Sequence, residues 1–145
     1  MAGDRAQKGF EALRVYQISE KLCDAIWNAV REWERLAQDT VGRQIVRAAD
    51  SVGANIAEGT GRGSFQDNRR FVRNARGSLY ETRHWLRRAH QRHLLSAQAV
   101  AEIKPLIDDL APRLNAYLRS IGPVNAGLDR AENPGANTRQ TEERH

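Results

Sequence analysis

Cysteine is almost missing from this 145-residue sequence, in which Cys23 is the only one. A single thiol excludes disulfides within one chain. Long hydrophobic runs are missing too: none could cross a bilayer, and none near the start resembles a secretion signal. We therefore expect a cytoplasmic protein that has no membrane partner.

The alternation of apolar and polar residues that marks a half-buried strand is also missing, and four segments repeat the helical period instead. The expected helices span residues 10–33, 41–57, 65–92 and 97–121. Short connections between them favour an all-α fold, an antiparallel up-down-up-down four-helix bundle. We expect residues 1–9 to be flexible, residues 10–121 to form the bundle, and residues 122–145 to be a disordered polar tail.

Only four prolines punctuate the chain. Pro105 and Pro112 fall inside the fourth helical pattern, and each lacks a backbone N–H, so we expect a kink or break near one of them. Gly59 suits a left-handed residue that ends the second helix. Ser64, with an acid three residues later, and Ser96 suit N-caps of the third and fourth helices.

The first helix has more apolar surface than one bundle face needs. A second apolar stripe lies beside its main one. The excess indicates another packing surface, and we predict a contact between subunits there. The predicted contact residues are Tyr16, Trp27 and Val30.

Positive charge is what the sequence has in excess, and it is concentrated in one segment. The chain carries a formal net charge of +5. Residues 64–93 hold eight arginines and two acidic residues, a local charge of +6. Such a segment attracts polyanions.

The basic residues of this segment fall into a regular line along the third helix. Their steps of four and three residues place them on one helix face. Arginine binds phosphate oxygens in bidentate fashion, and a tyrosine between arginines can stack on a base. We predict a surface for nucleic acid, RNA rather than DNA. Its residues are Arg69, Arg73, Arg76, Tyr80, Arg83 and Arg87.

The glycine-rich run 59–63 is not a phosphate loop of a nucleotide-binding fold, because it follows a helix and not a strand. An ordinary turn between helices is the favoured interpretation. Arg62 and the first backbone amides of the third helix could together hold one phosphate. Asn55 and Glu58 are expected to cap or hydrogen-bond this turn.

His90 and His93 could share a helix face, but they lack further metal ligands nearby, so neither a metal nor a cofactor is expected. Arg83-His84 followed by His90 fits the Arg-polar-x₄₋₆-His pattern of helical ribonucleases. In a segment so rich in arginine and histidine such matches arise by chance. We expect no enzyme activity, and name a histidine-dependent ribonuclease as the least favoured alternative.

Several motifs together resemble a known family. They lie at residues 13–17, 43–49, 51–59 (which includes Asn-Ile-Ala-Glu-Gly) and 75–81 (which includes Gly-Ser-Leu-Tyr-Glu). The chain resembles the four-helix-bundle proteins encoded in intervening sequences of 23S ribosomal RNA genes. It differs from their usual pattern in the cluster from Arg87 to His93 and in its polar tail.

The resemblance implies a four-helix bundle and a ring-like homo-oligomer, with a pentamer expected. It also implies a distant likeness to the accessory variability proteins of diversity-generating retroelements, which are basic pentamers thought to bind nucleic acid and a reverse transcriptase. Our first hypothesis is therefore a non-enzymatic oligomer that binds nucleic acid. The alternative is a protein-interaction scaffold whose arginines meet acidic groups of a partner or of the adjacent subunit.

Overall fold

The computed structural model describes residues 2–122, with side chains from residue 9 onward, so the predicted tail lies outside the described residues except for Gly122. Four long helices make up most of this part: α1 (Ala2–Val30), α3 (Arg43–Thr60), α4 (Phe65–Gln91) and α5 (Ala97–Ser120). A short helix α2 (Arg35–Ala37) and a π-helical segment η1 (Gln38–Gly42) join α1 to α3.

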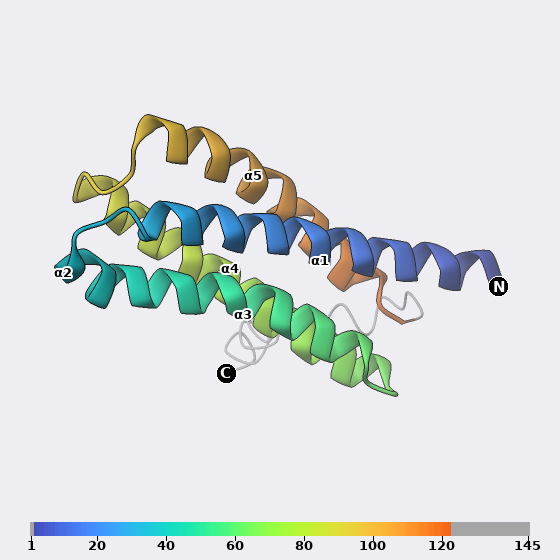
Figure 1. Ribbon diagram of the computed structural model, residues 1–145. Helices are drawn as coiled ribbons and strands as arrows, with labels where there is room; N and C mark the ends of the chain where they lie inside the picture. Colours follow the sequence, from blue (N-terminus) through green and yellow to red (C-terminus); the bar gives the residue numbers. More distant parts are fainter. Residues whose placement is uncertain (1, 123–145) are drawn as a thin grey trace, which may run out of the picture.

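Successive long helices run in opposite directions, as Figure 1 shows, so the predicted antiparallel up-down-up-down bundle is confirmed. The helix pairs do not pack equally. α3 packs extensively on α4, and α1 packs on both α3 and α5, whereas α4 and α5 touch much less. The bundle therefore has three tight interfaces and one loose interface within the described residues.

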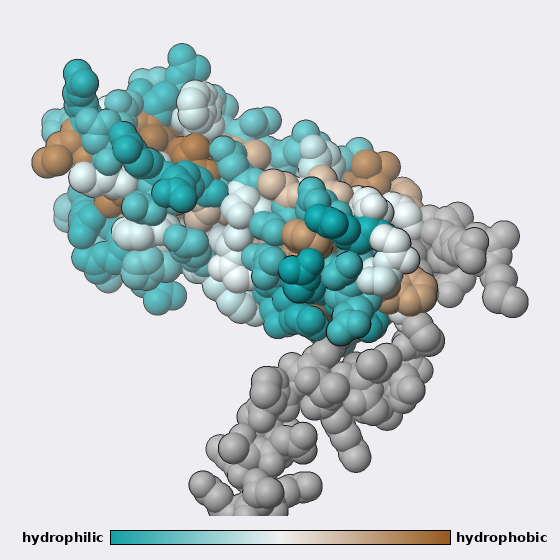
Figure 2. Space-filling model, turned by 90° about the horizontal axis from the view of Figure 1, so that it is seen from below, coloured by the Kyte–Doolittle hydropathy of each residue, from teal (hydrophilic) through white to brown (hydrophobic). Residues whose placement is uncertain are grey.

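The core consists of the apolar stripes of the four long helices. In α4 an apolar seam with steps of three and four residues runs from Val72 to Ala89, and it is buried at Val72, Ala75, Leu79, Thr82 and Ala89. Leu86 is the one seam residue that is only partly buried. The face of the molecule seen from below is mostly hydrophilic, with small separate apolar patches (Figure 2). No helix among residues 2–122 is long and apolar enough to cross a membrane.

Both boundaries of α1 differ from the prediction, and α3 ends at Thr60, beyond the predicted residue 57. α1 begins at Ala2 and not near Phe10, and thus includes the segment expected to be flexible. That segment contains alanine, arginine, glutamine and lysine, which favour helix without apolar periodicity. α1 also ends earlier, at Val30, where the Gln38 side-chain amide donates to the carbonyls of Val30 (3.1 Å) and Arg31 (3.0 Å). These bonds satisfy carbonyls at the helix end.

The predicted serine caps are confirmed. The Ser64 hydroxyl accepts a hydrogen bond from the Asp67 backbone N–H (3.1 Å), and the Ser96 hydroxyl accepts one from Ala99 N–H (3.0 Å). Pro105 and Pro112 do not break α5, which continues unbroken through both. Each proline removes one helix bond, and burial of the apolar side chains around them holds the helix together.

The prediction of a left-handed Gly59 is wrong. Gly59 lies inside α3, is buried, and is not among the positive-φ residues. A Cβ at this position would come within 2.5 Å of Asn68 Oδ1 and 3.1 Å of Phe71 Cβ. Glycine is required here because α4 passes very close to the α3 backbone. The left-handed glycine is instead Gly122 (φ 83°), which follows the end of α5.

Candidate nucleic-acid interface

The buried seam of α4 fixes which face of this helix points outward, and with it the position of the arginine line. The structure divides that line in two. The first half, residues 65–78, contains Arg69, Arg73 and Arg76, all partly buried. The second half, residues 79–91, contains Tyr80, Arg83 and Arg87, all exposed.

The arginines of the first half have polar partners within the molecule. Arg69 Nη1 donates to the carbonyl oxygen of Ile121 (2.8 Å), beside Gly122 at the end of α5. Arg76 Nη1 donates to Asn115 Oδ1 of α5 (3.4 Å). Arg73 takes part in an interaction of its own as well. The guanidinium groups of Arg69 and Arg76 therefore help to hold α5 against α4, a role that the charge pattern did not reveal.

Two nearby arginines that are not part of the line, Arg62 and Arg70, are paired with acids. Arg62 Nη2 lies 2.5 Å from Glu58 Oε1, and Arg70 Nη2 lies 3.4 Å from Asp67 Oδ1. Both guanidinium groups also lie over the ring of Phe71, at 4.9 and 4.8 Å from its centroid. The Glu58 carboxylate beside Arg62 would repel a phosphate, so the pairing weakens the case for an anion site at Arg62, which stays a prediction.

Asn55 and Glu58 behave as structural residues of α3. The Asn55 side-chain amide donates to the carbonyl of Ser51 (2.8 Å) and to its hydroxyl (3.1 Å), and the Ser78 hydroxyl of α4 donates to the same Ser51 hydroxyl (3.1 Å). Glu58 pairs with Arg62 within one helical turn. Asn55 thus bonds within α3 and not to the turn that follows it, and Glu58 reaches that turn only through Arg62. Among the described bonds neither side chain caps the helix, so the expected capping role is not confirmed.

The second half of α4 presents exposed cations. Arg83 and Arg87 make no hydrogen bond or ion pair with any other described residue. Lys104 of α5 lies beside the same surface and is exposed as well. Tyr80, one turn before Arg83, keeps 49% of its surface exposed. We call Tyr80, Arg83, Arg87 and Lys104 the basic surface.

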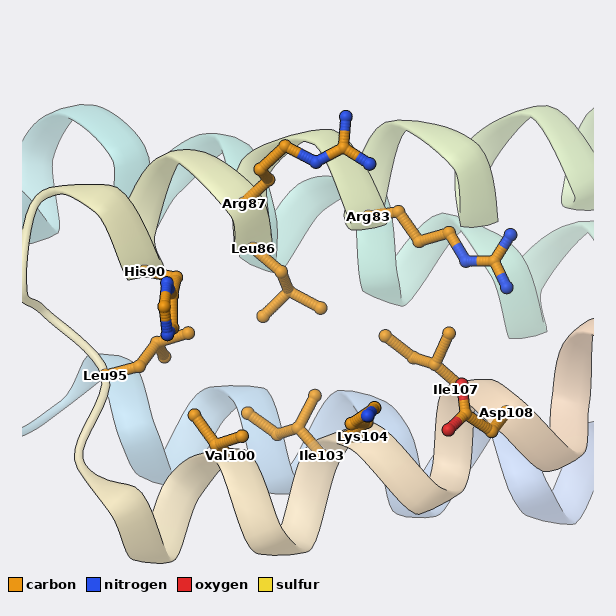
Figure 3. A pocket seen from close by; sticks show the side chains of 10 residues that line it. All are labelled: Arg83, Leu86, Arg87, His90, Leu95, Val100, Ile103, Lys104, Ile107 and Asp108. Carbon is orange, nitrogen blue, oxygen red and sulfur yellow. The ribbon is translucent and has the colours of Figure 1, made fainter.

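An open groove of about 350 Å³ runs beside the basic surface, between α4 and α5. In Figure 3, Leu86, Ile103 and Ile107 point toward the space between the helices, whereas Arg83 and Arg87 extend along α4. Leu86 and Val100 lie on the inward faces of their helices by helical spacing, yet both are only partly buried. Sequence periodicity predicted their direction but not the gap that they border.

His84, His90 and His93, the described histidines, lie in three different surroundings. His90 lies at one end of the groove, and His93 lies in the turn after α4 with a left-handed backbone (φ 60°). The His84 ring packs edge-on against Trp85, at 4.8 Å between centroids. Within residues 2–122, no three His, Cys, Asp or Glu side chains gather closely enough to hold a metal ion.

The predicted subunit surface on α1 is only partly available. Val30 is 8% exposed and packs in the core, so the prediction that it contacts another subunit is wrong: η1 covers it, and a Cβ on Gly42 would come within 2.8 Å of its Cγ1. Tyr16 is half-buried against the core. Trp27 is 58% exposed, and so are two residues that the prediction missed, Phe10 (63%) and Leu13 (53%).

Comparison with known proteins identifies a family and a solved structure that this chain resembles. The model of the family described as 23S rRNA-intervening sequence protein matches residues 11–116. Among solved structures, a protein of unknown function from the S23 ribosomal protein family of Bacteroides thetaiotaomicron superposes with a TM-score of 0.66 at 20% identity, covering 75% of this chain and 98% of that one. At this identity the likeness shows the fold alone. No curated protein matches the chain. Because the family match covers most of the sequence, the chain belongs to the 23S rRNA-intervening sequence protein family.

Proposed function

We propose that this protein binds nucleic acid, RNA in preference to DNA, through the basic surface at the second half of α4. The observation that carries the proposal is that Arg83 and Arg87 are exposed and have no partner among the described residues. We further propose that the protein is cytoplasmic and is not an enzyme.

The chemistry of the surface suits a phosphate backbone. Arg83 and Arg87 lie one turn apart on α4, so their guanidinium forks can reach neighbouring phosphates. Lys104 adds a third charge, and the exposed Tyr80 ring offers a face on which a base can stack. The family name refers to 23S rRNA, and RNA is therefore the first nucleic acid to test.

A homo-oligomer, with a pentamer as the expectation, would strengthen such binding. Several copies of one basic surface in a ring sum their fields and attract a polyanion more strongly than one copy does. Trp27, Phe10 and Leu13 are large apolar side chains exposed on α1, and burial between subunits would remove them from water. They are the residues through which we propose that the copies meet.

The test is fluorescence anisotropy of the full chain with a labelled mixed-sequence RNA at several salt concentrations, with the mass measured by light scattering. The double substitution Arg83→Glu/Arg87→Glu is expected to abolish binding at moderate salt. Arg62→Glu/Arg70→Glu is the matched control, because it changes the net charge equally at arginines already paired with acids. Equal affinity of both variants and the wild type would refute the proposal.

A further inference from the structure

We propose that the groove between α4 and α5 is a docking site for an acidic amphipathic helix of a partner protein. The apolar floor, the length and the charge of the groove support this docking site, and none of them depends on RNA binding. Because the two sites share Arg83 and Arg87, a docked helix and an RNA would compete for the same cations.

The floor of the groove is continuous with the hydrophobic core, but its apolar side chains are not fully buried. Ile103 (3% exposed) and Ile107 (7%) are buried, yet Leu86 and Val100 beside them stay partly open to solvent. Elsewhere in the α4 seam, Val72, Ala75 and Leu79 are covered almost completely. Apolar side chains of a partner would complete the burial that α5 leaves incomplete at this end.

The length of the groove matches the anchors of a docked helix. Its walls run over residues 83–90 of α4 and 100–108 of α5. Each stretch rises about 10 Å, or about two helical turns. A helix that lies in a groove inserts side chains at positions i, i+3 or i+4, and i+7, which cover the same distance.

The charge of the rim selects an acidic partner. Arg83, Arg87 and Lys104 border the groove, and Asp108 is the only acid among the residues that line it. Glutamates flanking the apolar stripe of a partner helix would pair with the two guanidinium groups. Among the lining residues only His90 carries a ring, so the floor offers little to a stacked nucleic-acid base. A protein helix therefore fits the groove better than an unstacked RNA strand does.

The probe is a fluorescein-labelled peptide of about 15 residues with leucines at helical spacing and glutamates on both flanks of the stripe. A second peptide keeps the leucines and replaces every glutamate with lysine. Anisotropy with the full chain should show saturable binding of the acidic peptide, and binding of the lysine peptide weaker by at least about tenfold.

Two neighbouring residues of α5 provide a matched pair of variants. Val100→Glu places a carboxylate in the groove, whereas Ala101→Glu places the same charge on an exposed site outside its lining. We expect Val100→Glu to lower the affinity of the protein for the acidic peptide by about tenfold or more. Ala101→Glu should leave this affinity within about twofold of the wild-type value. Circular dichroism checks that both variants are folded.

If Val100→Glu is unfolded, the surface variant Arg83→Glu/Arg87→Glu replaces it, and the acidic peptide should then be lost. Absence of saturable binding, or equal binding of the two peptides, would overturn the proposal. The proposal would also be overturned if Val100→Glu lowered the affinity for RNA and left the affinity for the acidic peptide unchanged. That result would assign the groove to nucleic acid. Dissociation of an oligomer by Val100→Glu alone, seen by light scattering, would show that a second copy covers the groove.

Discussion

The two halves of α4 contain the same kind of residue on the same helix face and use it differently. Arg69 and Arg76 donate hydrogen bonds to the end of α5, whereas Arg83 and Arg87 have no described partner. The cause is the path of α5, whose last turns bond to the first half of α4 and whose first turns leave a groove beside the second half. Arginine spacing alone therefore does not tell a binding surface from an interhelical contact.

The largest effect should come from truncating the seam in each half. Leu79 is 1% exposed, and Leu79→Ala is expected to lower the free energy of unfolding by about 3 kcal/mol through lost burial and a cavity. Leu86→Ala should cost about 1 kcal/mol, because this side chain is already partly in solvent. Chemical denaturation measures both. Equal losses would mean that the groove is closed in solution.

The close contact between α3 and the first half of α4 gives the next largest effect. Gly59→Ala should destabilise the protein by about 2 kcal/mol, since the new methyl group meets Asn68 and Phe71. Gly77→Ala is the control within α4, where a Cβ meets nothing within 4 Å. It should stabilise the protein by about 0.5–1 kcal/mol. Thermal unfolding measures the stability of both variants. An unchanged stability of Gly59→Ala would contradict the close packing of α3 against α4.

Neutralising one arginine in each half of α4 tests whether the two halves differ in role. Arg69→Gln should cost about 1.5 kcal/mol of stability, because it removes a charge-assisted bond to the Ile121 carbonyl, and should change RNA affinity little. Arg83→Gln should leave stability within about 0.5 kcal/mol and lower the salt dependence of RNA binding by about one counterion. Chemical denaturation measures the stability of both variants, and anisotropy measures their RNA binding. If Arg69→Gln weakened RNA binding and Arg83→Gln did not, the RNA surface would lie on the first half of α4.

The smallest effect concerns Tyr117, which packs beneath the first half of α4 and whose hydroxyl accepts a hydrogen bond from the Asn68 amide (3.4 Å). Burial raises the pKa of Tyr117, and the hydrogen bond from Asn68 opposes that shift. The unfolded chain therefore loses this proton first, and stability should fall as the pH rises above about 10.

The substitution Tyr117→Phe should remove this part of the pH dependence. Denaturation curves of wild type and variant at pH 8 and at high pH are the measurement. The stability difference should shift in favour of the variant as the pH rises. A difference that stays constant with pH would show that the Tyr117 hydroxyl has ordinary access to water.

Much of the fold could be predicted from local patterns. The seam of α4 and the caps Ser64 and Ser96 follow from residues within a few positions of one another, so the sequence reveals them. Gly59 and Val30 were misjudged because their environments depend on how closely another segment approaches: α4 for Gly59 and η1 for Val30. Helical periodicity determines direction, whereas the distance between two helices depends on the packing of the whole bundle.

The candidate site was predicted in outline only. Helix spacing placed six residues on one face, but the Ile121 carbonyl and Asn115 that hold Arg69 and Arg76 are far away in the sequence. No local signal could have found these partners. The groove is equally non-local, because it exists only where α5 diverges from α4.

The unequal packing of the helix pairs also bears on the order in which the chain folds. α3 and α4 are consecutive in the sequence and share the most extensive interface, so only a short loop must close for them to meet. α1 and α5 lie at opposite ends of the described chain and must close a long loop. Because contacts between distant segments form slowly, we expect the α3–α4 hairpin to be the nucleus onto which the first and last helices assemble.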